Sequence, residues 1–415
     1  MTDNVIPTLA LDKCRLCASK DLKHIIDLGN VPSVHILKRE KSDLPLFPIN
    51  LYFCLQCGLA QLPTIDGVGS IYSNSDIYST SHQPVSHLSD LISALHTFRT
   101  LKKGLEIGCN DGRLMGALAD SGFGPLVGIE PNEVTSQAAR QNGLSVETAY
   151  FNKVTANLLR KRHGLFDFVV VRHVLEHISD LWEFLSETHK ILREDGVLLL
   201  ELPYVEPGFS AGAPNVLWEE HVNYFFEPVL IDMLENAGFR PEMRRHYTGG
   251  ALVIAILAVK AELPTIQSWP SGEAVSEYLK DYPDQIKRYQ AKLISTIIKA
   301  KEQDYCVVVY GAGFRSATTI NTMKIGALLD VVIDDRQDLE GMIMPGTVLT
   351  ITSFVKFNAN RRLLILLGVG AENEAKVIDK VKTEFSEVVP LSLVYPGNME
   401  GHCATAEILL TSANK

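Results

Sequence analysis

The sequence predicts an α/β protein with two doubly wound domains and a small cysteine-rich domain in front of them. Two CxxC pairs near the N-terminus form the first signal, and strand and helix patterns alternate over residues 104–203 and again over 306–381. Such alternation predicts a parallel sheet covered by helices on both faces. The expected domains are a zinc-binding domain, a larger α/β core and a second α/β domain, at residues 1–68, 69–260 and 261–415.

The composition is that of a packed globular protein. Of 415 residues, 46% are hydrophobic, and the formal net charge of −10 disfavours binding to a nucleic-acid backbone. No apolar run approaches the roughly 20 residues of a membrane-spanning helix, and the N-terminus lacks the basic and apolar parts of a signal peptide. We therefore expect a cytoplasmic enzyme, monomeric or weakly dimeric, with a small-molecule substrate and neither nucleic acid nor membrane as partner.

Four cysteines have the spacing of a structural zinc site. The first CxxC pair and the second are separated by residues 18–53, and two such knuckles complete a tetrahedral ligand set. All four positions are thiolates, so no ligand position stays open for catalysis. Redox or chance cysteines are the alternative, but a redox CxxC does not need a duplicate. The expected ligands are Cys14, Cys17, Cys54 and Cys57.

Residues 71–84 are polar and aromatic and are expected to form a loop. Residues 85–98 follow as an amphipathic helix. Its apolar positions recur at helical spacing, which predicts one buried face: Val85, Leu88, Leu91, Ile92 and Leu95.

A glycine-rich turn follows the first core strand. The stretch LEIGCNDG, residues 105–112, enters a helix, and the next strand ends at Glu130-Pro131. Glycines let a backbone approach a ligand closely, and an acid after the second strand accepts hydrogen bonds from ribose hydroxyls. An ordinary tight strand-to-helix turn is the alternative for the glycines alone. FDFVVVRHVLEHI (166–178) and DGVLLLELP (195–203) supply further strands, whose carboxyl ends are where ligands bind in such sheets.

The C-terminal third repeats this plan. After a helical stretch at 274–303, a strand at Val307–Val309 leads into Gly311-Ala-Gly313 and a helix after Arg315. Strands and helices continue through 331–335 and 362–381. A glycine turn on a helix N-terminus is a seat for an anion, because free N–H groups and the helix dipole face it. Alternatively, the turn is only a structural remnant of the fold and binds no ligand.

The core motifs resemble those of class I S-adenosylmethionine-dependent methyltransferases. The resemblance rests on LEIGCNDG, GIEPN, FDFVVVRHVLEHI and DGVLLLELP. It implies that the loop from Gly108 to Gly112 runs under the methionine part of the cofactor, that Glu130 holds the ribose, and that Tyr150 and Phe151 flank the adenine. The full set of expected cofactor-binding residues is Glu106, Gly108, Asn110, Gly112, Glu130, Pro131, Tyr150, Phe151 and His173.

The order of three domains resembles that of C-methyltransferases acting on nucleotide-linked keto-deoxysugars, over nearly the whole chain. The sharpest local match is WEEHVNYF, residues 218–225. The resemblance implies that His221 is the general base and that Glu220 orients its ring. It also implies a tyrosine, Tyr78, closing over the site, and His177 as a donor to the ketone. The substrate-binding residues expected from it are Trp218, Asn223, Tyr224, Gly311, Gly313 and Arg315.

The chemistry explains such a histidine independently. A C–H next to a ketone loses its proton to a base, and the enolate then attacks a sulfonium methyl group in line. Histidine suits this step because its pKa near 6.5 keeps much of it neutral and basic at neutral pH. Each residue also has a structural explanation: His221 could hold the loop, His177 could cap or pack a helix, and Tyr78 could cover the cofactor.

The sequence departs from that family at three positions. Trp218 and Glu219 stand where the family usually has tyrosine and often has histidine, and Arg315 lies where a lysine is common. Tryptophan offers an N–H donor but no phenol, and arginine grips a diphosphate in bidentate fashion. The predicted general base, His221, is present in this sequence. The three departures from the family fall on residues expected to contact the substrate.

Three other functions are alternatives to this prediction. A methyltransferase of the same architecture could methylate carbon, oxygen or nitrogen of a non-sugar metabolite. A zinc-dependent nucleic-acid binder would need basic clusters beside Cys14 or Cys54, but only scattered charges occur there. A nicotinamide oxidoreductase using Gly311-Ala-Gly313 would need a catalytic partner for Asp334-Asp335, and none is evident downstream.

Overall fold

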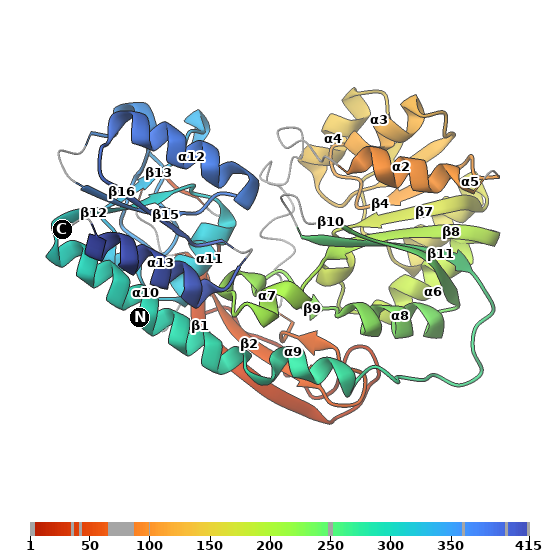
Figure 1. Cartoon of the computed structure of the whole chain (residues 1–415). Helices are drawn as coiled ribbons and strands as arrows, with labels where there is room; N and C mark the ends of the chain where they lie inside the picture. Colours follow the sequence, from red (N-terminus) through yellow and green to blue (C-terminus); the bar gives the residue numbers. More distant parts are fainter. Residues whose placement is uncertain are drawn as a thin grey trace.

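The computed structural model describes residues 5–34, 37–40, 44–64, 87–98, 100–247, 252–358, 362–394 and 397–412. Two α/β lobes stand side by side, and the long strands β1 and β2 of the N-terminal part lie below them (Figure 1). The methyltransferase-like lobe is drawn in orange to green, and the C-terminal lobe in blue.

The N-terminal sheet has four antiparallel strands, and one of them comes from the middle of the chain. The strand order is β1-β2-β3-β9, and the last pair is formed by Ala60 opposite Tyr224 and Gln61 opposite Asn223. The candidate catalytic loop around residue 221 therefore leads directly into this sheet. The strands are β1 (Leu22–Pro32), β2 (Leu46–Cys54), β3 (Ala60–Gln61) and β9 (Asn223–Tyr224).

The central sheet has seven strands in the order β10-β11-β8-β7-β4-β5-β6. β8, β7, β4, β5 and β6 are parallel as predicted, whereas β11 runs antiparallel to β8 and β10 antiparallel to β11. The apolar β11 covers the edge of β8, and β10 completes a hairpin with it. The strands are β4 (Gly104–Ile107), β5 (Leu126–Ile129), β6 (Val146–Glu147), β7 (Phe166–Arg172), β8 (Leu192–Pro203), β10 (Phe239–Tyr247) and β11 (Val253–Lys260).

Helices cover both faces of the central sheet, as its alternating sequence pattern predicted (Figure 1). The predicted apolar face of α2 is confirmed at Leu88, Leu91, Ile92 and Leu95, which are buried; Val85 lies outside the described residues. The helical segments are α2 (Leu88–His96), α3 (Arg113–Asp120), α4 (Glu133–Gln141), α5 (Lys153–His163), η2 (Leu175–His177), α6 (Leu181–Ile191), α7 (Glu206–Ser210), η3 (Pro214–Val216) and α8 (Glu227–Asn236).

The C-terminal domain has a five-stranded parallel sheet in the order β14-β13-β12-β15-β16. This confirms the second doubly wound unit. Its elements are β12 (Tyr305–Tyr310), α11 (Phe314–Thr322), η5 (Gly326–Leu328), β13 (Val331–Ile333), η6 (Gln337–Leu339), β14 (Ile351–Thr352), η7 (Phe354–Lys356), β15 (Arg362–Leu367), α12 (Ala371–Glu384), β16 (Val388–Ser392) and α13 (Met399–Ser412).

The helical stretch expected at 274–303 is divided into three segments. They are η4 (Ala274–Ser276), α9 (Glu277–Lys280) and α10 (Tyr282–Glu302). Pro283 lies in the first turn of α10, where a missing N–H costs nothing, but proline does not continue a preceding helix. In α10, the buried side chains recur at helical spacing and form one stripe.

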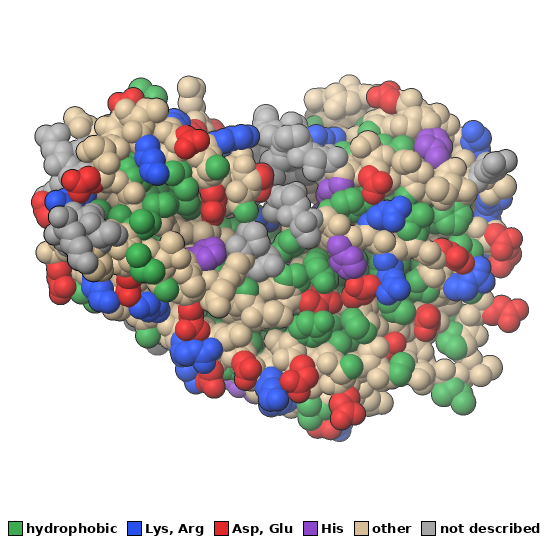
Figure 2. Space-filling model, viewed as in Figure 1, with side chains coloured by type: hydrophobic (Ala, Val, Ile, Leu, Met, Phe, Trp, Pro, Cys, Tyr) green, Lys and Arg blue, Asp and Glu red, His purple; other side chains and the backbone are tan. Residues whose placement is uncertain are grey.

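Within the described residues, no helix combines the length and apolarity that a membrane span needs. On the face drawn in Figure 2, acidic and basic side chains are intermixed, without a large patch of either sign.

Candidate active site

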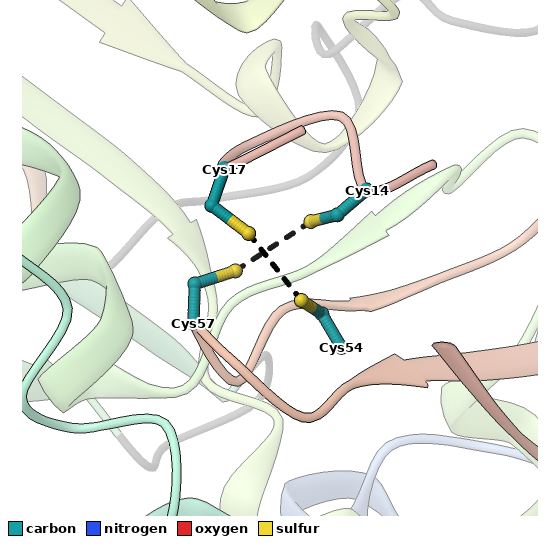
Figure 3. A group of neighbouring side chains, drawn as sticks. All are labelled: Cys14, Cys17, Cys54 and Cys57. Atoms are coloured by element: carbon teal, nitrogen blue, oxygen red, sulfur yellow. Dashed lines mark hydrogen bonds between the residues drawn. The ribbon is translucent and has the colours of Figure 1, made fainter. Parts of the chain in front are cut away.

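The four predicted cysteines meet at one point. The Sγ atoms of Cys14 and Cys57 are 3.5 Å apart, and those of Cys17 and Cys54 are 3.4 Å apart (Figure 3). Zinc–sulfur bonds of about 2.3 Å in a tetrahedron place sulfurs about 3.8 Å apart, so the arrangement fits zinc. Cys14, Cys54 and Cys57 are buried, which suits a structural metal with no open ligand position.

The glycine-rich loop after β4 packs closely against Val174, and its approach to a ligand stays a prediction. Gly108 has φ +74°, and a Cβ there would lie 2.4 Å from the Val174 side chain. Asn110 also has a positive φ, 51°, and Gly112 takes a left-handed conformation at the start of α3. Other residue types rarely adopt these angles, so the loop conformation depends on glycine and asparagine.

Glu130 holds this loop against the end of β5. Its carboxylate accepts hydrogen bonds from the backbone N–H of Asn110, at 2.9 Å, and of Asn132, at 2.8 Å. Burial raises the pKa of Glu130, and the two backbone donors oppose that rise. Each carboxylate oxygen retains acceptor capacity for a further donor, such as a ribose hydroxyl. Pro131 lies between Glu130 and Asn132, so it stands at the same end of β5.

Glu106 is a buried carboxyl with capacity for a cationic ligand. It is 5% exposed, and within the described structure its Oε2 atom has no hydrogen-bond partner. Burial raises its pKa to about 8, with Glu130 and Asp111 adding to the rise and Arg172 opposing it. An unpartnered buried oxygen beside a glycine cradle fits the ammonium group of S-adenosylmethionine.

The two aromatic residues expected near adenine differ in their surroundings. Tyr150 is 57% exposed, whereas Phe151 is partly buried and packs edge-on against Phe184 with ring centroids 5.4 Å apart. Both stand after β6 and before α5, beyond the strand that follows Glu130. Their adenine contact stays a prediction.

A charged cluster that the sequence reasoning missed lies at the ends of β7 and β8. Glu201 is fully buried and accepts from Arg172 Nε at 2.9 Å and Nη2 at 2.7 Å, and it lies 2.9 Å from His87 Nε2. His173 Nε2 is 3.3 Å from the same carboxylate. These partners outweigh burial and hold the pKa of Glu201 far below its usual range. The sequence signal for this cluster was Glu201, a single acidic residue inside the otherwise apolar run VLLLELP.

His173, expected to bind the cofactor, has an unusual backbone conformation and an unusually high pKa. Its φ is 51°, a left-handed value that is uncommon outside glycine and often marks functional sites. Burial disfavours its charged form, but contacts with Glu176 and Glu201 raise its pKa to about 9. His173 is therefore cationic at neutral pH, between two carboxylates.

His221 and His177 come together, as the resemblance implied. Their ring centroids are 4.8 Å apart, and His177 Nδ1 lies 3.0 Å from the main-chain oxygen of Glu220. His221 Nε2 lies 4.0 Å from Oε1 of Glu176, a residue that was not among the predicted site residues. Desolvation lowers the pKa of His177, and the Glu176 charge opposes that shift. The catalytic roles of His221, Glu220 and His177 stay predictions, and Tyr78 lies outside the described residues.

The loop that carries His221 is fixed from both sides. Val222 N–H donates to the carbonyl of Glu176 at 2.9 Å, and the Val222 carbonyl accepts from Leu62 N at 3.0 Å. The same carbonyl accepts from Arg15 Nη1 at 2.9 Å. Arg15 lies between the zinc ligands Cys14 and Cys17, so the zinc knuckle directly holds the backbone next to His221.

Asn223 and Tyr224, expected to bind substrate, are both buried in β9. Asn223 Nδ2 donates to the carbonyls of Leu175 and Ile178, at 3.2 and 2.7 Å. The Tyr224 hydroxyl accepts from Trp218 N at 3.1 Å and donates to Trp218 O at 3.3 Å. These contacts shape the loop, and a direct substrate contact by either side chain stays a prediction.

Trp218 joins this loop to the C-terminal domain. Its ring packs edge-on against His221 at 4.4 Å and lies 4.3 Å from the ring of Phe314. Phe314 is the first residue of α11, directly after the Gly311-Ala-Gly313 turn. Trp218, a predicted substrate-binding residue, therefore contacts the residue that follows the predicted glycine turn of the C-terminal domain.

The C-terminal glycine turn is built like the glycine-rich loop of the core. Asp334, after β13, accepts from Ala312 N at 2.7 Å and from Arg336 N at 2.9 Å, as Glu130 accepts from Asn110 and Asn132. Gly311 has φ +104°, and a Cβ there would lie 2.9 Å from the backbone of Gly368. Burial lowers the pKa of Arg315, and Glu372 opposes that shift.

Comparison with known proteins agrees with this architecture. Three family models match: a zinc binding domain over residues 14–71, a methyltransferase domain over 81–242 and a C-methyltransferase C-terminal domain over 270–376. C-methyltransferase NovU of Streptomyces niveus is 23% identical over 371 residues, 85% of this chain and 87% of that protein.

Other relatives match shorter stretches of the chain. A ubiquinone biosynthesis O-methyltransferase of Haemophilus ducreyi is 34% identical over 107 residues, 24% of this chain and 44% of that protein. A crystal structure of an S-adenosylmethionine dependent methyltransferase from Mesorhizobium loti aligns with a TM-score of 0.34 and 13% identity, over 41% of this chain and 96% of that one. The three consecutive family matches, on a chain with the corresponding sheets and four-cysteine cluster, give the conclusion. The chain belongs to the S-adenosylmethionine-dependent methyltransferases that combine a zinc-binding domain, a methyltransferase core and a C-methyltransferase C-terminal domain.

Proposed function

We propose that this methyltransferase methylates a carbon next to a ketone on a nucleoside-diphosphate-linked deoxysugar, in secondary-metabolite or surface-glycan biosynthesis. The observation that carries the proposal is the packing of Trp218 against both His221 and Phe314. It brings a candidate base of the core within reach of the glycine turn of the C-terminal domain. The likeness to a C-methyltransferase over most of the chain supports carbon as the methylated atom.

His221 removes the proton from the carbon beside the ketone. Its imidazole is largely enclosed, with a side chain 12% exposed, and Glu176 lies 4.0 Å from Nε2. A carboxylate at this distance stabilises the imidazolium that forms when the proton arrives. His177 Nδ1–H donates to the Glu220 carbonyl, so Nε2 can donate to the enolate oxygen only when the His177 ring carries a second proton.

The core domain holds the cofactor beside this base. When bound, S-adenosylmethionine supplies an electrophilic methyl group on a positive sulfur. Glu106 would hold its ammonium group, Glu130 would hold its ribose, and the loop from Gly108 to Gly112 would border its methionine part. The residues of the chain contribute mainly orientation, which is the dominant requirement for an in-line displacement.

The C-terminal domain holds the nucleoside diphosphate. Gly313 precedes α11, whose first N–H groups and dipole attract a phosphate. Arg315, in the first turn of α11, adds a guanidinium that suits a diphosphate. The sugar then extends from this turn toward Trp218 and His221.

A screen of nucleotide-sugar ketones with labelled methyl donor tests the proposal. His221→Ala should bind S-adenosylmethionine as the wild type does but transfer methyl about 10²-fold more slowly, the usual scale of a general base. His246→Gln, at a histidine paired with Glu227 on β10, is a matched control and should keep full activity. Undiminished transfer by His221→Ala would assign the base to another residue.

O-methylation of another small molecule is the second candidate, favoured by the 34% identity to an O-methyltransferase over 107 residues. Deuterium exchange separates the two functions. Carbon methylation through an enolate requires exchange at the carbon beside the ketone in deuterated water, and this exchange must depend on His221. Transfer without that exchange contradicts the enolate route.

A further inference from the structure

Glu176, His177 and His221 form a compact cluster of metal-ligating groups beside the proposed site. Glu176 and His177 belong to η2, directly after β7, and His221 lies on the loop before β9. One ligand atom from each of the three lies within 4.8 Å of the others. This cluster is separate from the four cysteines and comes from a different part of the fold.

Glu176 is the most unusual member of this cluster. Its side chain is 2% exposed, and within the described residues neither carboxylate oxygen has a hydrogen-bond partner. His173 Nδ1 lies 3.4 Å from Oε1 and His221 Nε2 lies 4.0 Å from it. Charge-assisted hydrogen bonds are usually about 2.7–2.9 Å, so neither contact satisfies the carboxylate. The cationic His173 offsets part of the cost of burying this charge, but among the described residues neither carboxylate oxygen receives a hydrogen bond.

We propose that Glu176, His177 and His221 bind a divalent transition-metal ion, such as Zn²⁺ or Co²⁺, in addition to the structural zinc. Two imidazoles and one carboxylate are a donor set that these ions prefer. With ligand bonds of about 2.0–2.2 Å, tetrahedral ligand atoms lie about 3.4 Å apart, so the cluster closes through side-chain movements of about 1 Å.

The surroundings of His177 are those of a metal-bound histidine. Its Nδ1 faces the Glu220 carbonyl at 3.0 Å, which leaves Nε2 as the ligand atom. Metal-binding histidines characteristically use their second nitrogen in this way, because the carbonyl fixes the tautomer and the ring orientation. The side chain of His177 is exposed, so an ion has a path from solvent.

Occupation of this site regulates the enzyme. An ion bound to His221 takes the lone pair that would accept the substrate proton, so metal binding inhibits methyl transfer. This consequence rests on the proposed function, whereas the binding of the ion does not. Cofactor affinity stays unchanged, because the ion occupies the substrate side of the site.

Spectroscopic titration of the zinc-loaded full-length protein with Co²⁺ tests the binding. Cobalt bound by imidazole and carboxylate gives weak visible bands, whereas cobalt exchanged into the four-cysteine site gives intense sulfur-to-metal charge transfer. We expect one equivalent of the first kind. Glu176→Gln and His177→Ala should each weaken it at least 10-fold, and His246→Gln, at another histidine–glutamate pair, should leave it unchanged. His177→Ala keeps the test valid if the buried Glu176 proves necessary for folding.

The results separate this inference from the proposed function. Absence of the imidazole–carboxylate bands, or equal cobalt affinity in wild type and His177→Ala, overturns the metal site and leaves Glu176 as a counter-charge only. If cobalt binds as expected but His221→Ala still transfers methyl at the wild-type rate, the metal site stands and the proposed base is wrong. Inhibition by Zn²⁺ that a mild chelator reverses, with structural zinc retained, supports both.

Discussion

The guanidinium of Arg15 donates a hydrogen bond to the carbonyl of Val222, 207 residues further along the chain, at a distance of 2.9 Å. Arg15 lies inside the first zinc knuckle, and Val222 follows His221. The same guanidinium donates to Leu62 O at 2.5 Å and Thr64 Oγ1 at 2.7 Å. Burial lowers the pKa of Arg15 to about 10, so it stays charged at neutral pH. The zinc-binding domain thus acts as a support for the loop of the candidate base.

Replacing Arg15 should therefore slow catalysis without affecting the cofactor. Arg15→Met should lower the free energy of unfolding by about 3 kcal/mol, since hydrogen bonds to charged groups contribute about 1.5–3 kcal/mol each. Methyl transfer should fall at least about 10-fold, because a misplacement of about 1 Å costs up to about 10²-fold. Urea denaturation and single-turnover transfer measure the two effects. Arg240→Met, at an exposed pair with Glu242, is the control, and full activity of Arg15→Met would refute the link.

Removal of the structural zinc should disturb the same loop. Without the metal the knuckle that carries Arg15 loses its fixed shape, because structural zinc sites contribute folding free energy directly. Trp182 Nε1 donates to Leu16 O at 2.6 Å, inside the knuckle, so its fluorescence should change when zinc leaves. We expect loss of methyl transfer in step with zinc content, restored by one equivalent of zinc, which the four-cysteine site takes up first. A zinc-free protein that transfers methyl at the full rate contradicts this dependence.

The raised pKa of His173 predicts a specific dependence of stability on pH. Its pKa in the folded protein is about 9, against about 6.5 for an unperturbed histidine. Between these values the folded state holds a proton that the unfolded state has lost, so stability falls as pH rises from about 6.5 to 9. His173→Asn should remove part of this slope in urea midpoints, while Glu106 contributes equally to both proteins. Parallel profiles of the two proteins would show that His173 is not charged at neutral pH.

The contact of Trp218 with Phe314 should couple the two domains energetically. Aromatic pairs contribute about 0.5–1.5 kcal/mol beyond their buried area. A double-mutant cycle of Trp218→Leu and Phe314→Leu, measured by unfolding, should give a coupling of about 1 kcal/mol. Each single variant should also raise the KM for the nucleotide sugar more than that for S-adenosylmethionine. Additive effects on stability would mean that the two rings pack independently.

The sequence alone determined the parts that depend on local patterns. The four zinc ligands follow from CxxC spacing, and the loop around Gly108 and Gly112 from the backbone angles that only glycine adopts readily. Strands and helices of both α/β domains follow from hydrophobic periodicity, because burial of one face requires it. The break before α10 also has a local cause, Pro283, although the sequence predicted one helical stretch over residues 274–303.

Only the tertiary structure decided which distant residues meet. Nothing local indicates that Asn223 and Tyr224 pair with Ala60 and Gln61, that Arg15 reaches Val222, or that Phe314 covers Trp218. Glu201 likewise meets Arg172 and His87, and Glu176 meets His221, only through the assembly of distant segments. Contacts of this kind depend on how the sheets are assembled, and a side chain's charge and partners are set by that assembly, not by its neighbours in the chain.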